Sequence, residues 1–362
     1  MSRTIKHAAM TAAVVSISVL SQHASADTLQ VLSLPAGYTS SSIELGVPFG
    51  GSLAKNPLSN SLYVASGNFG NQSILKLDLG ILTTSTVATG LGNIGGLACL
   101  ANGDLIITEN LTSDTIFRAR DLTADGDFQD PGEITELIGP ILTNPGDFTG
   151  AHLAIAPAGN AAGIPGGSVL VQTADGGTSS ELLVITDPLG TPAYSPPGGA
   201  FYSGFTYNGG VAFTNTGHVI MGSSEFPNAR ILALVNSNAD PDIDAGESNV
   251  VVPAAQLGNG LADLAVSAEN HTYFTENSGD IRTFTLPGNL LTGTATPALF
   301  AQTNGVYIST VRFDDPSKTF AAGSAINTAK LFLGGYLTFP AATNLVVIQP
   351  SAVSAVSDWQ MY

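Results

Sequence analysis

Short apolar segments separated by turns recur along the chain from about residue 50 onwards. The clearest copy is GGLACLANGDLIITEN (95–110), in which one apolar segment, a turn containing Gly103 and a second apolar segment follow one another. GGVAFTNTGHVIMGSS (209–224) repeats this order, and a third apolar segment follows each copy (TIFRA at 115–119, RILAL at 230–234). Because these segments are short and are bounded by Gly, Asn and Pro, the pattern predicts strands rather than helices.

Four weaker copies of the same plan begin at Gly51, Gly150, Gly260 and Ser309. The six copies start at residues 51, 95, 150, 209, 260 and 309, roughly 44 to 59 residues apart, which is typical of β-propeller blades. A β-sandwich would not repeat one plan six times, and a parallel β-helix would need shorter coils. The pattern therefore predicts an all-β, six-bladed β-propeller with four-stranded antiparallel blades. We expect Thr28–Leu34 to close the ring by pairing with the last blade, since closure removes exposed sheet edges.

The first 26 residues differ from the rest of the chain. Arg3 and Lys6 precede an apolar run at Ala8–Leu20, and small residues (ASA) occupy 24–26. This order is typical of a secretory signal peptide, and the apolar run is too short to span a membrane. We expect cleavage near Ala26, a single propeller domain over residues 27–362, and a secreted or periplasmic protein without a membrane span.

Composition narrows the possible partners. The formal net charge is −17 although only 11% of the residues are charged, and such a surface repels nucleic acid and anionic lipid. Cys99 is the single cysteine, so the chain has no intramolecular disulfide and an exported form must be stabilised by packing, ring closure or metal. We expect a monomer.

Two acidic loops follow the third apolar segment of the two clearest copies. DLTADGDFQDPGE (121–133) holds five carboxylates in thirteen residues, and NSNADPDIDAGE (236–247) places oxygen side chains at positions 1, 3, 5, 7, 9 and 12. That spacing is the ligand pattern of an EF-hand loop, whose hard oxygens suit calcium. The candidate metal ligands are Asp121, Thr123, Asp125, Asp127, Asp130 and Glu133 in the first loop, and Asn236, Asn238, Asp240, Asp242, Asp244 and Glu247 in the second.

Neither loop is a complete EF-hand. The glycine expected at position 6 is present as Gly126, but Pro241 replaces it in the second loop, and predicted strands rather than helices flank both loops. We interpret them as two acidic hairpin insertions, stabilised by Ca²⁺ with a structural role. The alternative is a pair of solvated acidic turns.

Residues beside the start of each predicted innermost strand are candidates for the axial site. These positions hold Ser52, Gly96, His152, Gly210, Asp263 and Thr310. His152 can act as a general base or bind a metal or substrate, and Asp263 can bind a metal or orient another group, so these two are the catalytic candidates. The alternative for both residues is a structural contact with a neighbouring blade.

The repeated plan GxLA…GxLYVA…N…I resembles NHL-type propellers and the gluconolactonase-like group over nearly the whole mature chain. This resemblance implies one divalent metal on the axis, and Glu109, Asn208 and Asp263 are side chains of suitable type. A second, partial resemblance covers HLAIAPAGN and VLVQTADGG within 152–177, which look like the glucose/sorbosone dehydrogenases. It implies a quinone cofactor with His152 as general base. The chain departs from that pattern at Ala174, where a glycine is expected, and it has few Lys and Arg residues to hold an anionic quinone.

No GxSxG, HExxH, GK[ST] or CxxC motif occurs. The sequence favours an exported, calcium-stabilised propeller that binds a protein, glycan or small-molecule ligand. The alternatives are a metal-dependent hydrolase or lactonase of gluconolactonase type and a quinone-dependent sugar dehydrogenase. Fold alone does not choose among these functions.

Overall fold

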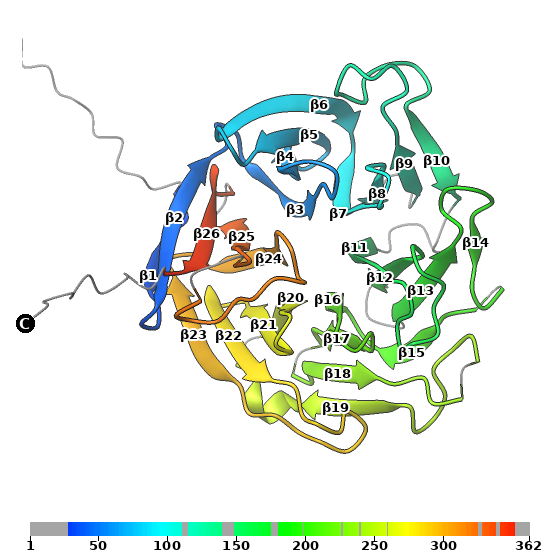
Figure 1. The fold of residues 1–362 in the computed structure, drawn as a ribbon, viewed down its shortest axis with the longest axis vertical. Helices are drawn as coiled ribbons and strands as arrows, with labels where there is room; N and C mark the ends of the chain where they lie inside the picture. Colours follow the sequence, from blue (N-terminus) through cyan, green and yellow to red (C-terminus); the bar gives the residue numbers. More distant parts are fainter. Residues whose placement is uncertain are drawn as a thin grey trace, which may run out of the picture.

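The chain forms six antiparallel sheets around a central axis (Figure 1), so the predicted six-bladed all-β propeller is confirmed. This computed structural model describes residues 28–110, 115–139, 148–174, 180–197, 199–225, 227–238, 240–258, 260–324, 328–337 and 341–351. The expected signal peptide at 1–26 lies outside the described residues. In the described part, the only helix is the short 3₁₀ segment η1 (Ala254–Gln256). No described helix is long and apolar enough to cross a membrane.

The strands of each blade follow one another from the axis outwards. Blade 1 contains β3 (Phe49–Lys55), β4 (Ser61–Asn68), β5 (Asn71–Asp78) and β6 (Thr83–Leu91). Blade 2 contains β7 (Asn93–Cys99), β8 (Leu105–Asn110), β9 (Ile116–Ala119) and β10 (Ile134–Ile138). Blade 3 contains β11 (Phe148–Ile155), β12 (Val169–Ala174), β13 (Ser180–Thr186) and an outer position shared by β14 (Ala193–Tyr194) and β15 (Tyr202–Phe205).

The second half of the ring follows the same order. Blade 4 contains β16 (Asn208–Phe213), β17 (Val219–Ser223), β18 (Arg230–Leu234) and β19 (Ser248–Val252). Blade 5 contains β20 (Leu261–Val266), β21 (His271–Glu276), β22 (Asp280–Thr285), β23 (Ala298–Thr303) and the additional β1 (Val31–Ser33). Blade 6 contains β24 (Tyr307–Phe313), β25 (Leu331–Tyr336), β26 (Asn344–Pro350) and β2 (Tyr38–Glu44).

Ring closure differs from the prediction. The predicted closing segment, Thr28–Leu34, contains β1, which pairs with β23 at the outer edge of blade 5. The last blade is completed instead by β2, which pairs with β26 in an unbroken register from Tyr38–Pro350 to Glu44–Asn344. The prediction was wrong because the outer edge of β26 needs a partner of matching length, and the seven residues of β2 provide it.

The innermost strands share a three-residue pattern that the fold explains. The residue after each axial position is Leu or Val and is buried: Leu53, Leu97, Leu153, Val211, Leu264 and Val311. The next residue is alanine in five blades, namely Ala54, Ala98, Ala154, Ala212 and Ala265. In blade 6 the equivalent residue is Arg312, which is the only charged residue at this position of the six innermost strands.

Candidate functional site

Residues at the predicted axial positions link successive blades. The amide of Leu97 in blade 2 donates to Ser52 Oγ in blade 1 (3.0 Å), and Thr310 Oγ1 in blade 6 donates to the carbonyl of Gly51 in blade 1 (2.8 Å). Asp263 Oδ2 in blade 5 accepts a hydrogen bond from the Val311 amide in blade 6 (2.9 Å). The axial positions therefore bind the blades to one another, which is the structural role left open by the sequence.

Asp263 also joins His152 and Arg312 in one buried cluster. His152 Nδ1 lies 3.0 Å from Asp263 Oδ1, and Arg312 Nη1 lies 2.6 Å from Oδ2 and 2.8 Å from Oδ1 of the same carboxylate. The side chain of Asp263 is 0% exposed and that of His152 is 7% exposed. The structure thus brings the two predicted catalytic residues together, and it adds an arginine that the sequence had not singled out.

Gly210 allows this contact across blade 4, which lies between the blades of His152 and Asp263. A Cβ on Gly210 would lie 2.8 Å from Asp263 Oδ1 and 2.4 Å from the Leu264 nitrogen. Its φ of +98° also lies in a region that residues with a side chain rarely adopt. Glycine at this axial position is therefore required by the position of the Asp263 carboxylate.

The electrostatics keep Asp263 ionised. Burial alone would raise the pKa of this carboxyl, but Arg312, His152 and the Val311 amide hold it below its usual value. A carboxylate at His152 Nδ1 keeps the ring proton on that nitrogen, which leaves Nε2 as the acceptor. His152 is therefore oriented as a general base would be.

The metal set implied by the gluconolactonase resemblance does not fit these contacts. Both Asp263 oxygens are engaged by Arg312, and a divalent cation would have to displace that guanidinium. Glu109, at the end of β8, accepts a hydrogen bond from the Asn93 amide (3.1 Å), and Asn208 begins β16. A divalent metal bound by Asp263 is therefore incompatible with the Arg312–Asp263 ion pair.

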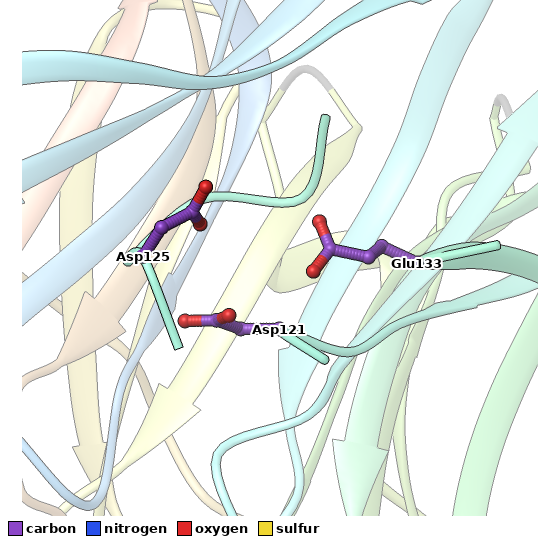
Figure 2. Close-up of side chains that lie close together, drawn as sticks. All are labelled: Asp121, Asp125 and Glu133. Carbon is purple, nitrogen blue, oxygen red and sulfur yellow. The ribbon is translucent and has the colours of Figure 1, made fainter. Parts of the chain in front are cut away.

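The two acidic loops lie at equivalent places on the rim. The first joins β9 to β10 in blade 2 and the second joins β18 to β19 in blade 4, two blades away in the ring (Figure 1). In the first loop Asp121, Asp125 and Glu133 turn their carboxylates toward one another (Figure 2), with ligand atoms all within 4.8 Å. In the second loop Asp240, Asp244 and Glu247 form a group of the same size.

Buried glutamates organise both loops in the same way. Glu133 Oε1 accepts a hydrogen bond from the Leu122 amide (2.7 Å), and its Oε2 accepts one from the Asp130 amide (3.1 Å). Glu247 accepts equivalent bonds from Ser237 (2.7 Å) and Asp244 (3.0 Å). Hydrogen bonds from the Ser237 side chain and from backbone amides lower the pKa of Glu247. Each glutamate side chain is thus held in place by hydrogen bonds at the base of its loop.

The remaining predicted ligands lie outside these two groups of three. In the first loop they are Thr123, Asp127 and Asp130. In the second they are Asn236, Asn238 and Asp242. Asn236 Nδ2 donates to the Ala162 carbonyl (3.2 Å), while Asn238 Nδ2 bridges the carboxylates of Asp240 (2.8 Å) and Asp244 (3.1 Å). Partial burial and the carboxylates of Asp240 and Asp244 raise the pKa of Asp242.

Each acidic loop also contacts the preceding blade. The amide of Phe128 donates to the Val87 carbonyl in blade 1 (2.7 Å), and its buried ring packs against Tyr63 at a centroid distance of 5.5 Å. The equivalent residue of the second loop, Ile243, donates from its amide to the Phe201 carbonyl in blade 3 (2.8 Å). We name these two loops the rim clasps, because each fastens its blade to the one before. A large apolar residue at the eighth position of each acidic stretch was the sequence signal for this contact.

Comparisons with known proteins place the chain by fold. No family model matches it, and no curated protein matches it in sequence. Among solved structures, it resembles regucalcin, a calcium-binding protein from Agrobacterium tumefaciens (12% identity, TM-score 0.58, covering 84% of this chain and 92% of that one). It also resembles a gluconolactonase from Xanthomonas campestris (11% identity, TM-score 0.58, covering 90% of this chain and 95% of that one). A third similar structure is the PQQ-bound aldose sugar dehydrogenase from Streptomyces coelicolor (13% identity, TM-score 0.59, covering 88% of this chain and 99% of that one).

These likenesses establish the fold at low sequence identity. The predicted resemblance to six-bladed propellers of the gluconolactonase-like kind is confirmed at that level, and the predicted likeness to a sugar dehydrogenase is present as a likeness in fold. The two acidic groups on the rim suggest metal binding.

Proposed function

We propose that the protein hydrolyses small esters or lactones on the propeller axis, with His152 as the general base. The observation that carries this proposal is the buried His152–Asp263 pair at 3.0 Å, in which Asp263 fixes the ring and Nε2 is left as the proton acceptor. The likeness in fold to gluconolactonases supports a hydrolase over a protein that only binds a partner.

The reaction needs only groups of this chain and water. His152 Nε2 takes a proton from a water molecule as that water adds to the substrate carbonyl, and Asp263 stabilises the imidazolium that results. The same proton then passes to the leaving alkoxide, so the ester and water become a carboxylic acid and an alcohol. Arg312 keeps Asp263 ionised throughout because it remains paired with that carboxylate.

Two other functions have less support from the axial contacts. A metal-dependent lactonase would need the Asp263 oxygens that Arg312 occupies. A quinone-dependent dehydrogenase would need cations for an anionic cofactor. A cavity on the axis is lined by residues of β11, β16, β20 and β24 and the turns after them, and Arg312 is the one cation among the described residues that line it.

The test is turnover of p-nitrophenyl acetate, p-nitrophenyl butyrate and a set of sugar lactones. Replacing His152 with Gln should lower kcat at least about 100-fold, the size of a general-base contribution. His271→Gln, at the start of β21, is the matched control and should leave kcat unchanged. Circular dichroism would show that both variants fold. Absence of turnover by the unmodified protein, or full turnover by His152→Gln, would contradict the proposal.

We further propose that the two rim clasps bind Ca²⁺ as a structural ion and that the chain is exported after cleavage near Ala26. The acidic groups, each with ligand atoms within 4.8 Å, and the likeness in fold to a calcium-binding protein support the first part. The positive and apolar N-terminal segment supports the second. Amino-terminal sequencing of the exported protein should begin at Asp27. An intact Met1 on exported protein would contradict cleavage.

A further inference from the structure

A cavity of about 700 Å³ opens on the axis beside the ends of four innermost strands. Its walls come from β11, β16, β20 and β24 and from the turns that follow them, beginning at Leu153, Val211, Leu264 and Arg312. His152 and Asp263 do not line it. The cavity therefore begins one residue beyond the catalytic candidates on β11 and β20, and Arg312 lies between it and Asp263. Its volume is within the range of small-molecule sites.

The walls of the cavity are largely apolar. Ile155, Ala212 and Phe213 line it and are partly exposed to it. Polar groups of the lining include Thr214 and Asn215 in the turn after β16, and these are already paired. Thr214 Oγ1 lies 2.9 Å from Thr216 Oγ1, and Asn215 Nδ2 donates to the Ala268 carbonyl (2.9 Å).

Arg312 is the exception in this lining. It occupies the position that is alanine in the other five blades, and its side chain is 20% exposed. Its Nη1 atom is committed to Asp263 and to the carbonyls of Leu264 and Val311 (3.0 Å each). Among the described residues, Nε and Nη2 have no partner, so one edge of the guanidinium is left with its donors unused.

We propose that this cavity binds a small monocarboxylate with an apolar body. The free Nε–Nη2 edge of a guanidinium is the pair of donors that holds a carboxylate through two parallel hydrogen bonds. The apolar walls would contact the rest of the ligand. A compact hydrated anion such as phosphate would leave this apolar part of the cavity unfilled. Asp263 already balances most of the charge of Arg312, so the recognition depends on paired hydrogen bonds rather than on charge alone.

The probes are octanoate, octanamide and inorganic phosphate, measured by isothermal titration calorimetry on the whole protein. Octanoate should bind with one site per chain, and octanamide and phosphate at least about tenfold more weakly. Arg312→Lys keeps a positive charge beside Asp263 but removes the paired edge, so it should weaken octanoate binding at least about tenfold. Ala154→Leu should weaken it as well, because it fills the cavity and leaves Arg312 unchanged.

Arg230→Lys is the matched control, since Arg230 lies on β18 and its Nη2 donates to the Gly204 carbonyl away from the cavity. Its affinity for octanoate should equal that of the unmodified protein. The proposal fails if octanoate does not bind, if octanamide binds equally well, or if the Ala154→Leu and Arg312→Lys variants keep full affinity. Octanoate contains no ester, so these results are independent of the hydrolysis proposed for His152.

Discussion

Calcium should stabilise the folded protein through the rim clasps. In the first clasp Asp121, Asp125 and Glu133 bring three carboxylates within 4.8 Å, and each pair repels by about 1 kcal/mol even in a water-like dielectric. A cation that binds the folded loop removes this repulsion and stabilises by mass action, by about 2.7 kcal/mol per site at a concentration 100 times Kd. For a chain of this length, that corresponds to a rise in Tm of about 4 °C per clasp.

The assay is differential scanning calorimetry after chelation and again with millimolar calcium. Asp125→Asn removes a ligand from the first clasp, and Asp240→Asn removes the ligand at the equivalent position of the second. Each variant should therefore lose about half of the calcium-dependent rise in Tm. Glu44→Gln is the matched control, because Glu44 is an exposed carboxylate on β2 outside both rim clasps, and this variant should keep the whole rise. An unchanged Tm of the unmodified protein on adding calcium would show that the rim clasps bind no calcium, and an equal loss in all three variants would show that these carboxylates are not its ligands.

Three further predictions concern the axis and the core. Gly210→Ala should lower the free energy of unfolding by roughly 3 kcal/mol, because its Cβ would lie 2.4 Å from the Leu264 nitrogen at a positive φ; an unchanged urea midpoint would contradict this. The lowered pKa of Asp263 contributes stability that is present above the unfolded-state pKa of about 3.9 and is lost as the pH falls through the lower folded-state value. Urea midpoints between pH 6 and pH 2 should therefore fall more steeply in the unmodified protein than in Asp263→Asn, and equal slopes would disprove the pairing. Burial raises the pKa of Cys99 to about 12, so a thiol reagent at pH 8 should react much more slowly with the folded than with the unfolded protein, and equal rates would count against it.

The blades could be predicted from the sequence because each repeat contains its own local signals. An axial residue, a buried Leu or Val and then Ala mark the start of an innermost strand in five of the six blades, and Gly and Asn mark the turns. The acidic loops could be found for the same reason, since their oxygens are neighbours along the chain. His152 and Asp263 stood out because the other axial positions hold small or hydroxylic residues.

Contacts between blades could not be predicted in this way. The pairing of Arg312 with Asp263 joins residues of different blades, and it depends on a register that no local pattern fixes. Ring closure was predicted with the wrong segment, since both β1 and β2 have partners that lie far away at the other end of the chain. The contact of Phe128 with blade 1 depends likewise on how two finished blades meet.

Anomalous diffraction from crystals grown with calcium tests the division of roles between rim and axis most directly. We expect one ion in each rim clasp, bound by Asp125 and Glu133 in one and by Asp240 and Glu247 in the other, with Arg312 still paired to Asp263. An ion coordinated by Asp263 on the axis, with Arg312 displaced, would contradict it and would favour a metal-dependent reaction instead.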